Sequence, residues 1–80
     1  MRPVFVFIKC ELGKTYEVAD ELVDSIEQVS EVYSVSGQYE LLAKFNLDDD
    51  QDIGHFVCEQ VQKIPHIKDT FTLISFKVFS

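Results

Sequence analysis

The residues best suited to bind a small molecule lie in two short segments, Gly37–Glu40 and Thr70–Thr72. In the first, Gly37 permits a tight turn whose backbone N–H groups suit an anion, and Glu40 supplies a carboxylate that can hold an ammonium group. A carboxylate and an ammonium are the two charged groups of an amino acid. The alternative interpretation is a plain hairpin turn with two threonines at a strand edge, and the residues alone favour that alternative.

Other candidate chemical groups do not complete a site. Cys58 and His55 lie three positions apart on a predicted helix, within reach of one another. Neither an activated thiolate nor a full set of zinc ligands accompanies them. The acidic run 48–52 suggests a calcium-binding loop, but Gly54 is misplaced for one, and carboxylates suit a helix N-terminus without any metal. No phosphate-binding loop, dinucleotide motif or nucleophile elbow is present. The sequence predicts no enzyme activity, no metal and no cofactor.

Length and charge restrict the partners of the chain. Its 80 residues make one domain, 1–80. The net charge is −7 and the seven cations are scattered singly, so we expect no direct binding to DNA or RNA. No membrane span and no signal peptide are recognisable, which predicts no membrane association and a cytoplasmic location. Cys10 and Cys58 both lie in apolar patterns, so both are predicted to be buried free thiols.

Hydrophobic periodicity predicts six elements. Strands are expected over 3–11, 31–36, 40–47 and 70–79, where β-branched and aromatic residues gather. One helix is expected from an N-cap at Thr15 to Val29, and a second from the acidic run to Pro65. The first helix is predicted to bury Ala19, Leu22, Val23, Ile26 and Val29. The second is predicted to bury Ile53, Phe56, Val57, Val61 and Ile64.

This order, βαββαβ, predicts an α+β ferredoxin-like sandwich, a four-stranded antiparallel sheet with two helices on one face. The other face is expected to be polar in a monomer. Instead, the first and last strands are apolar on both sides. A second copy packed sheet on sheet would cover that face and support a chain too short for a large core. We therefore expect a homodimer through the open sheet face, the alternative being an unusually apolar monomer.

Two motifs resemble a known family. Ser34–Leu42 (SVSGQYELL) is similar to the hairpin V-(T/S)-G-x-Y-D-L-L of the Lrp/AsnC transcriptional regulators, and Ile64–Ile74 (IPHIKDTFTLI) is similar to their I-P-G-V-x-x-T-x-T-x-I segment. The resemblance covers nearly the whole chain and corresponds to the C-terminal effector-binding (RAM) domain of those regulators. Glu40 stands where the family usually has Asp, and His66 stands where it usually has Gly.

The resemblance implies the same ferredoxin-like fold, a face-to-face dimer and further assembly into rings of dimers such as octamers. It implies that an amino acid or related small metabolite binds between dimers. The implied pocket residues are Gly37, Gln38, Tyr39, Glu40, Thr70, Thr72 and Leu73. The family's helix-turn-helix domain has no counterpart before Met1. We therefore expect an effector domain that acts alone as a sensor, or that joins rings with a DNA-binding Lrp/AsnC relative.

Two alternatives remain open at this stage. Small dimeric ferredoxin-like monooxygenases, of α/β-barrel type, place His, Asn or Trp in a cavity between helices and sheet. This chain has no Trp, and Asn46 falls within a strand pattern. A pure oligomerisation module without a ligand is the second alternative, and nothing in the sequence separates it from a sensor.

Overall fold

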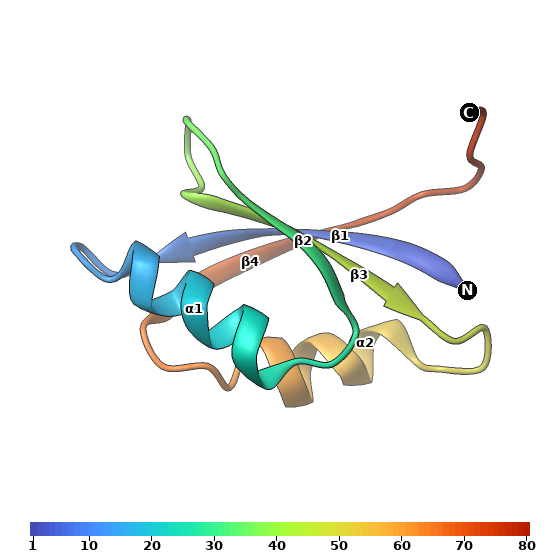
Figure 1. The fold of residues 1–80 in the computed structure, drawn as a ribbon, viewed down its shortest axis with the longest axis horizontal. Coiled ribbons are helices and arrows are strands. Elements are labelled where there is room, and N and C mark those ends of the chain that lie inside the picture. Colours follow the sequence, from blue (N-terminus) through green and yellow to red (C-terminus); the bar gives the residue numbers. More distant parts are fainter.

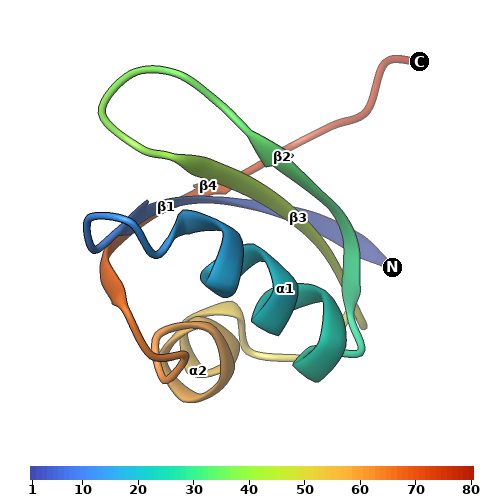
Figure 2. The same cartoon turned by 60° about the vertical axis from the view of Figure 1, so that its left-hand side comes forward.

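The computed structural model describes residues 1–80 as two layers, a sheet and a pair of helices (Figure 1). Strands β1 (Arg2–Cys10), β2 (Val29–Ser34), β3 (Leu41–Leu47) and β4 (Ile67–Ile74) pair antiparallel in the order β2-β3-β1-β4. Helix α1 (Thr15–Ser25) and helix α2 (Ile53–Phe56), which continues as a π-helical turn η1 (Val57–Val61), cover one face of the sheet (Figure 2). The predicted ferredoxin-like fold is confirmed.

The core lies between the sheet and the helices. Alternate residues of β1 and β3 point into it, as the apolar alternation of β1 predicts. Phe45 of β3 and Phe56 of α2 meet edge to face at its centre, with ring centroids 5.1 Å apart. The buried side chains are Val4, Val6, Ile8, Cys10, Val18, Leu22, Ile26, Leu41, Ala43, Phe45, Leu47, Phe56, Val57, Val61 and Ile64. None of them is polar or charged.

The prediction for the first helix is wrong in its cap, in the burial of Val23 and in its end, whereas Leu22 and Ile26 are buried as predicted. Thr15 is the first residue of α1, and Lys14 occupies the N-cap position that was expected for Thr15. Val18 is buried where Val23, which was predicted to be buried, is exposed. The inward stripe runs at spacings of four through Val18, Leu22 and Ile26. Val29 leaves the helix because it starts β2, opposite Phe45 of β3.

The second helix begins where the acidic run predicts it. Asp52 is its N-cap, and the Asp52 Oδ1 accepts a hydrogen bond from the backbone N–H of His55 at 3.0 Å. Capping accounts for this carboxylate without a metal ion. All four buried residues of this region, from Phe56 to Ile64, belong to the predicted stripe, and Ile53 packs against them.

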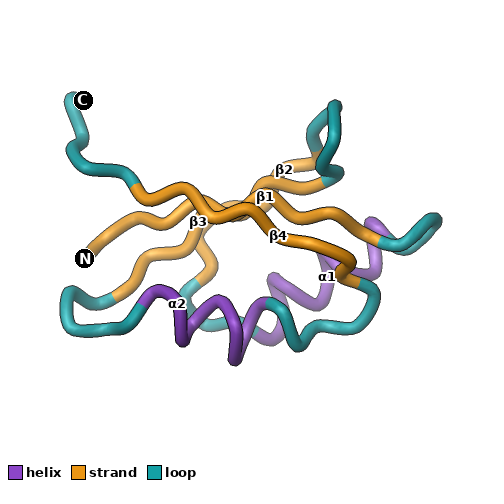
Figure 3. The backbone as a smooth tube through the Cα atoms, turned by 180° about the vertical axis from the view of Figure 1, so that it is seen from behind, coloured by secondary structure: helices purple, strands orange, loops and turns teal.

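The strand boundaries also differ from the prediction. The second strand begins at Val29 and ends at Ser34, and the last strand spans Ile67–Ile74 rather than 70–79. Pairing of β4 with β1 ends at Ile74 opposite Val4, beside Pro3, whose nitrogen carries no hydrogen. Beyond Ile74, Ser75–Ser80 run free of the sheet (Figure 3).

None of the helices has the length and apolar character that crossing a membrane requires.

The two cysteines have different surroundings. Cys10 is buried as predicted, but Cys58 is exposed, which contradicts the prediction. Val57 and Val61 take the inward positions of η1, so Cys58 faces outward. Burial raises the pKa of the Cys10 thiol above its ordinary 9.0, the charge of Glu40 raises it further, and a hydrogen bond with Thr15 opposes them.

We therefore expect a thiol reagent to react with one cysteine of the native protein rapidly and with the other only after unfolding. Cys58→Ser should remove the rapid phase, and Cys10→Ser should preserve it, because the thiolate is the reactive form and Cys10 is both covered and protonated. Colorimetric titration with and without denaturant measures both phases. Two rapidly reacting thiols in the native wild type would contradict the assigned burial.

Since folding raises the Cys10 pKa, the contribution of Cys10 to stability should fall as pH rises from about 9.

Candidate functional site

The connection between β2 and β3 carries Gly37–Glu40 and rises on the side of the sheet away from the helices (Figure 1). Gly37 has a φ of +113°, a conformation that residues with a Cβ rarely adopt. The backbone N–H of Val35 donates to the Glu40 carbonyl at 2.9 Å, and the N–H of Glu40 donates to the Ile8 carbonyl at 3.1 Å. The hairpin is thus closed on itself and fixed to β1, while its tip stays exposed.

Glu40 fastens the hairpin to the end of β1. Its Oε1 accepts a hydrogen bond from the backbone N–H of Cys10 at 2.6 Å. Its Oε2 lies 4.0 Å from Lys9 Nζ, and the same Nζ donates to the Gln38 carbonyl at 3.0 Å. The Glu40 side chain is 36% exposed. The bond to Cys10 spans thirty positions of sequence, and no local pattern predicts it.

Tyr39 links the hairpin to the open face, which is the side of the sheet opposite the helices. Its ring lies 5.8 Å from that of Phe7 in β1 and is stacked on that of Phe71 in β4 at 6.3 Å. The Phe7 and Phe71 rings are themselves 6.5 Å apart. We call Phe7, Tyr39 and Phe71 the aromatic cluster. Nearby on this face, hydrogen bonding to Glu31 and its charge raise the pKa of Tyr33.

The predicted residues of β4 divide between the two faces of the sheet. Thr70 and Thr72 pair with Ile8 and Val6 of β1, so they lie on the helix side. Leu73 pairs with Phe5 and lies on the open face. Thr70 and the hairpin are nevertheless at the same end of the sheet, since both adjoin Ile8. No hollow of the surface is lined by residues of both segments.

A shallow hollow adjoins Thr70 at the edge of β4. Its volume is about 280 Å³, and it is lined by Gln62, Ile67, Lys68, Asp69 and Thr70. Gln62 Nε2 donates to the Thr70 hydroxyl at 2.8 Å, and the Thr70 N–H donates to Asp69 Oδ1 at 2.9 Å. The sequence motif includes Thr70 but not Gln62. Gln62 contacts Thr70 only because folding brings the end of the helical segment beside β4.

The His66 loop is shaped by backbone conformation. His66 has a φ of +74°, which glycine adopts readily and which accounts for the Gly usual at this motif position. The His66 Nδ1 lies 2.9 Å from Glu11 Oε1, and the Glu11 N–H donates to the His66 carbonyl at 2.8 Å. These contacts tie the loop before β4 to the end of β1.

Nowhere do three or more His, Cys, Asp or Glu side chains gather as a metal site would require.

Comparison with known proteins agrees with this architecture. Residues 3–80 match the Lrp/AsnC ligand binding domain. The HTH-type transcriptional regulator FL11 of Pyrococcus abyssi is 33% identical over 73 residues, which cover 91% of this chain and 47% of that protein. The chain thus spans about half the length of the curated relatives it matches.

Solved structures share the fold over the whole chain. TTHA0845 from Thermus thermophilus has a TM-score of 0.89 at 28% identity, covering 100% of this chain and 99% of that one. Escherichia coli AsnC has a TM-score of 0.83 at 26% identity, covering 98% of this chain and 52% of that one. Because the family match extends from Pro3 in β1 to the last residue, and because the fold is shared, this chain belongs to the Lrp/AsnC ligand-binding domain family.

Proposed function

We propose that this chain is a sensor that binds an amino acid or a related small metabolite between copies of itself. The observation that carries the proposal is the hairpin Gly37–Glu40, whose tip is exposed while its base is fixed to β1 by the Glu40 carboxylate. The N–H groups of the glycine turn receive the carboxylate of the ligand, and Glu40 Oε2 or a threonine hydroxyl receives its ammonium.

The proposed sensor is a homodimer joined through the open face. Phe5, Phe7, Leu42, Phe71 and Leu73 are only half-buried or exposed on this face of the single chain. Packing two such faces removes that apolar surface from water. Dimers then associate further into a ring, and the ligand pocket combines hairpin residues of one dimer with Thr70 and Thr72 of its neighbour. Neither segment completes a pocket within one chain, which is why the site is placed between copies.

The output of the sensor is proposed to be regulation of transcription. The similar curated proteins are named as transcriptional regulators, and none of the groups described here forms a catalytic arrangement. The net charge of −7 makes direct contact with DNA unfavourable for this domain. Regulation is therefore exerted through assembly with DNA-binding Lrp/AsnC relatives. Ligand binding shifts that assembly by no more than its difference in affinity between dimer and ring.

The test begins with a thermal-shift screen against the twenty amino acids, followed by calorimetric titration of the best ligand. Glu40→Gln is expected to weaken binding by about ten- to a hundredfold, since a charge-assisted hydrogen bond contributes roughly 1.5–3 kcal/mol. The fold should be preserved because the glutamine oxygen still accepts the Cys10 N–H.

Glu59→Gln is the matched control for this experiment. Glu59 is also a carboxylate beside a lysine, with its Oε2 3.1 Å from Lys63 Nζ, but it lies on the helical layer. The Glu59→Gln variant should bind the ligand with the affinity of the wild type. Equal affinity of Glu40→Gln and wild type would remove Glu40 from the site, and no binding of any amino acid would favour a module that only oligomerises.

A further inference from the structure

The last six residues, Ser75–Ser80, form an irregular C-terminal arm that bends at Phe76 and has almost no contact with the rest of the chain. Three of its side chains are apolar, and Phe76, Val78 and Phe79 are 101%, 65% and 88% exposed. The Ser75 hydroxyl reaches the Pro3 carbonyl at 3.5 Å, and Lys77 Nζ lies 5.4 Å from the ring of Phe79 within the arm. Single exposed apolar residues are common, but three within six residues indicate a surface that meets a partner.

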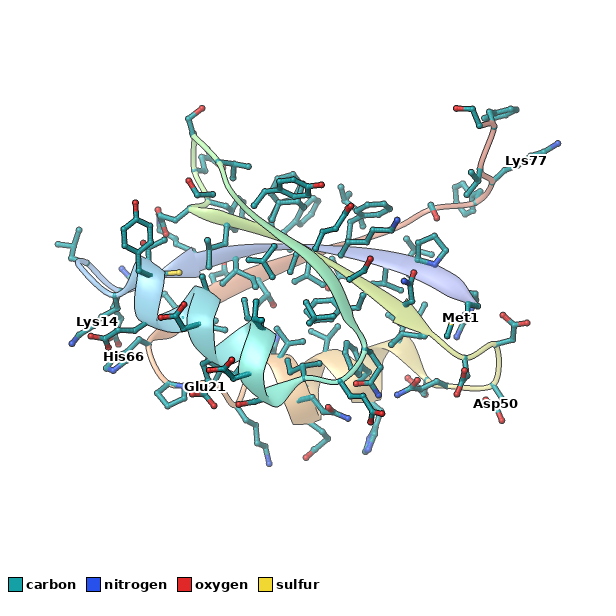
Figure 4. All side chains as sticks on the ribbon, viewed as in Figure 1. Met1, Lys14, Glu21, Asp50, His66 and Lys77 are labelled. Carbon is teal, nitrogen blue, oxygen red and sulfur yellow. The ribbon has the colours of Figure 1, made fainter.

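The arm projects on the open-face side of the sheet. In the views of Figures 1, 2 and 3 it leaves β4 and runs away from the helical layer. Figure 4 places Lys77 far from the sheet, on the side opposite Glu21 of α1. The open face itself is apolar, and Tyr39 of the hairpin covers only part of it. Its apolar side chains are Phe5, Phe7, Tyr33, Leu42, Phe71 and Leu73. An apolar arm and an apolar face are therefore presented on the same side of one chain.

Charge favours a second copy at this face over the helical face. Helix α1 and the residues just after it expose five carboxylates, so two helical layers would repel one another. These are Glu17, Asp20, Glu21, Asp24 and Glu27. The open face has both signs, with Lys9 and Lys44 near Glu31 and Asp69.

We propose that in the dimer each copy lays its arm, Ser75–Ser80, across the open face of the other copy. In this arrangement the exposed side chains of Phe76 and Val78 pack on the partner's apolar face. The twofold symmetry makes two equal arm contacts in each dimer. This inference rests on the face-to-face dimer of the proposed function and extends it.

The first experiment measures the dimer dissociation constant by sedimentation equilibrium. The double variant Phe76→Ser/Val78→Ser is expected to raise the constant by about ten- to a hundredfold, as loss of buried apolar anchors does at interfaces. Leu12→Ser is the control, because Leu12 is also an apolar side chain, 100% exposed, in the β1–α1 turn. It should leave the constant unchanged. Far-ultraviolet circular dichroism verifies that both variants keep the fold, as expected for exposed positions.

The second experiment identifies the chain that each arm touches. Isotope-filtered nuclear Overhauser spectra of mixed labelled and unlabelled protein should connect the Phe76 ring to Phe5 or Leu42 of the other copy. A wild-type dimer whose double variant is equally tight would overturn the arm proposal and leave the sheet-to-sheet dimer standing. Contacts of the arm only with its own chain would overturn it too. A wild type that is monomeric at micromolar concentration would instead remove the dimer of the proposed function, and the arm proposal with it.

Discussion

Phe7→Lys should abolish the dimer at micromolar concentration while leaving the chain folded. Phe7 stands on the middle of the open face, in contact with Tyr39 and Phe71 of the aromatic cluster. A lysine there would bury an ammonium without a partner when two faces pack, and burying an unpaired charge costs several kcal/mol. The twofold axis doubles that cost because both copies carry the substitution. In the monomer the lysine stays in water, so folding is little affected.

Light scattering coupled to size-exclusion chromatography measures this effect directly. Tyr16→Lys is the control, since Tyr16 is an exposed aromatic residue on α1, in the helical layer. It should remain as associated as the wild type. A Phe7→Lys protein that keeps the wild-type mass would show that the open face is not the interface. If Tyr16→Lys dissociates the protein and Phe7→Lys does not, the interface lies on the helical layer.

Phe45→Ala is expected to lower the melting temperature by more than about 15 °C or to prevent folding. Phe45 is completely buried and meets Phe56 edge to face. Truncation of a buried phenylalanine to alanine costs about 3–5 kcal/mol, and a domain of this size has only about 4–12 kcal/mol of total stability. In a small domain each 1 kcal/mol corresponds to roughly 4–8 °C.

Differential scanning calorimetry at one fixed protein concentration checks this prediction, since association makes the melting temperature depend on concentration. Tyr16→Ala removes an aromatic ring from an exposed position and should change stability by less than about 0.5 kcal/mol. A Phe45→Ala protein as stable as Tyr16→Ala would mean that the sheet and helices do not enclose this core.

Much of the architecture was predictable because it depends on local patterns. The period-two alternation of β1 separates buried Val4, Val6 and Ile8 from Phe5 and Phe7 on the open face. The turn at Gly37 is predictable because its φ of +113° is a conformation that favours glycine, and the sequence has glycine there. The acidic run marks the start of the second helix, but the helical turns end at Val61 rather than at the predicted Pro65. The two family motifs lie in the hairpin and in β4, where the family match is confirmed.

The first helix shows where local patterns fail. Its apolar residues allow two stripes one position apart, and Val23 fits one as well as Val18 fits the other. Contact with the sheet selects Val18, Leu22 and Ile26. The same contact decides the helix end, because Val29 pairs with Phe45 across β2 and β3. Cys58 follows the same logic, since packing of Val57 and Val61 leaves it outside.

By itself, the sequence determined the order of elements, the open apolar face and the family of this protein, because each depends on residue types at short spacings. Only the tertiary structure decided the faces of the site residues and their partners. Thr70 and Thr72 lie on one face and Leu73 on the other because of the register with β1. The Glu40 carboxylate is held by the N–H of Cys10, and Tyr39 joins Phe7 and Phe71. These contacts join segments distant along the chain, and strand register, which no local spacing encodes, brings them together.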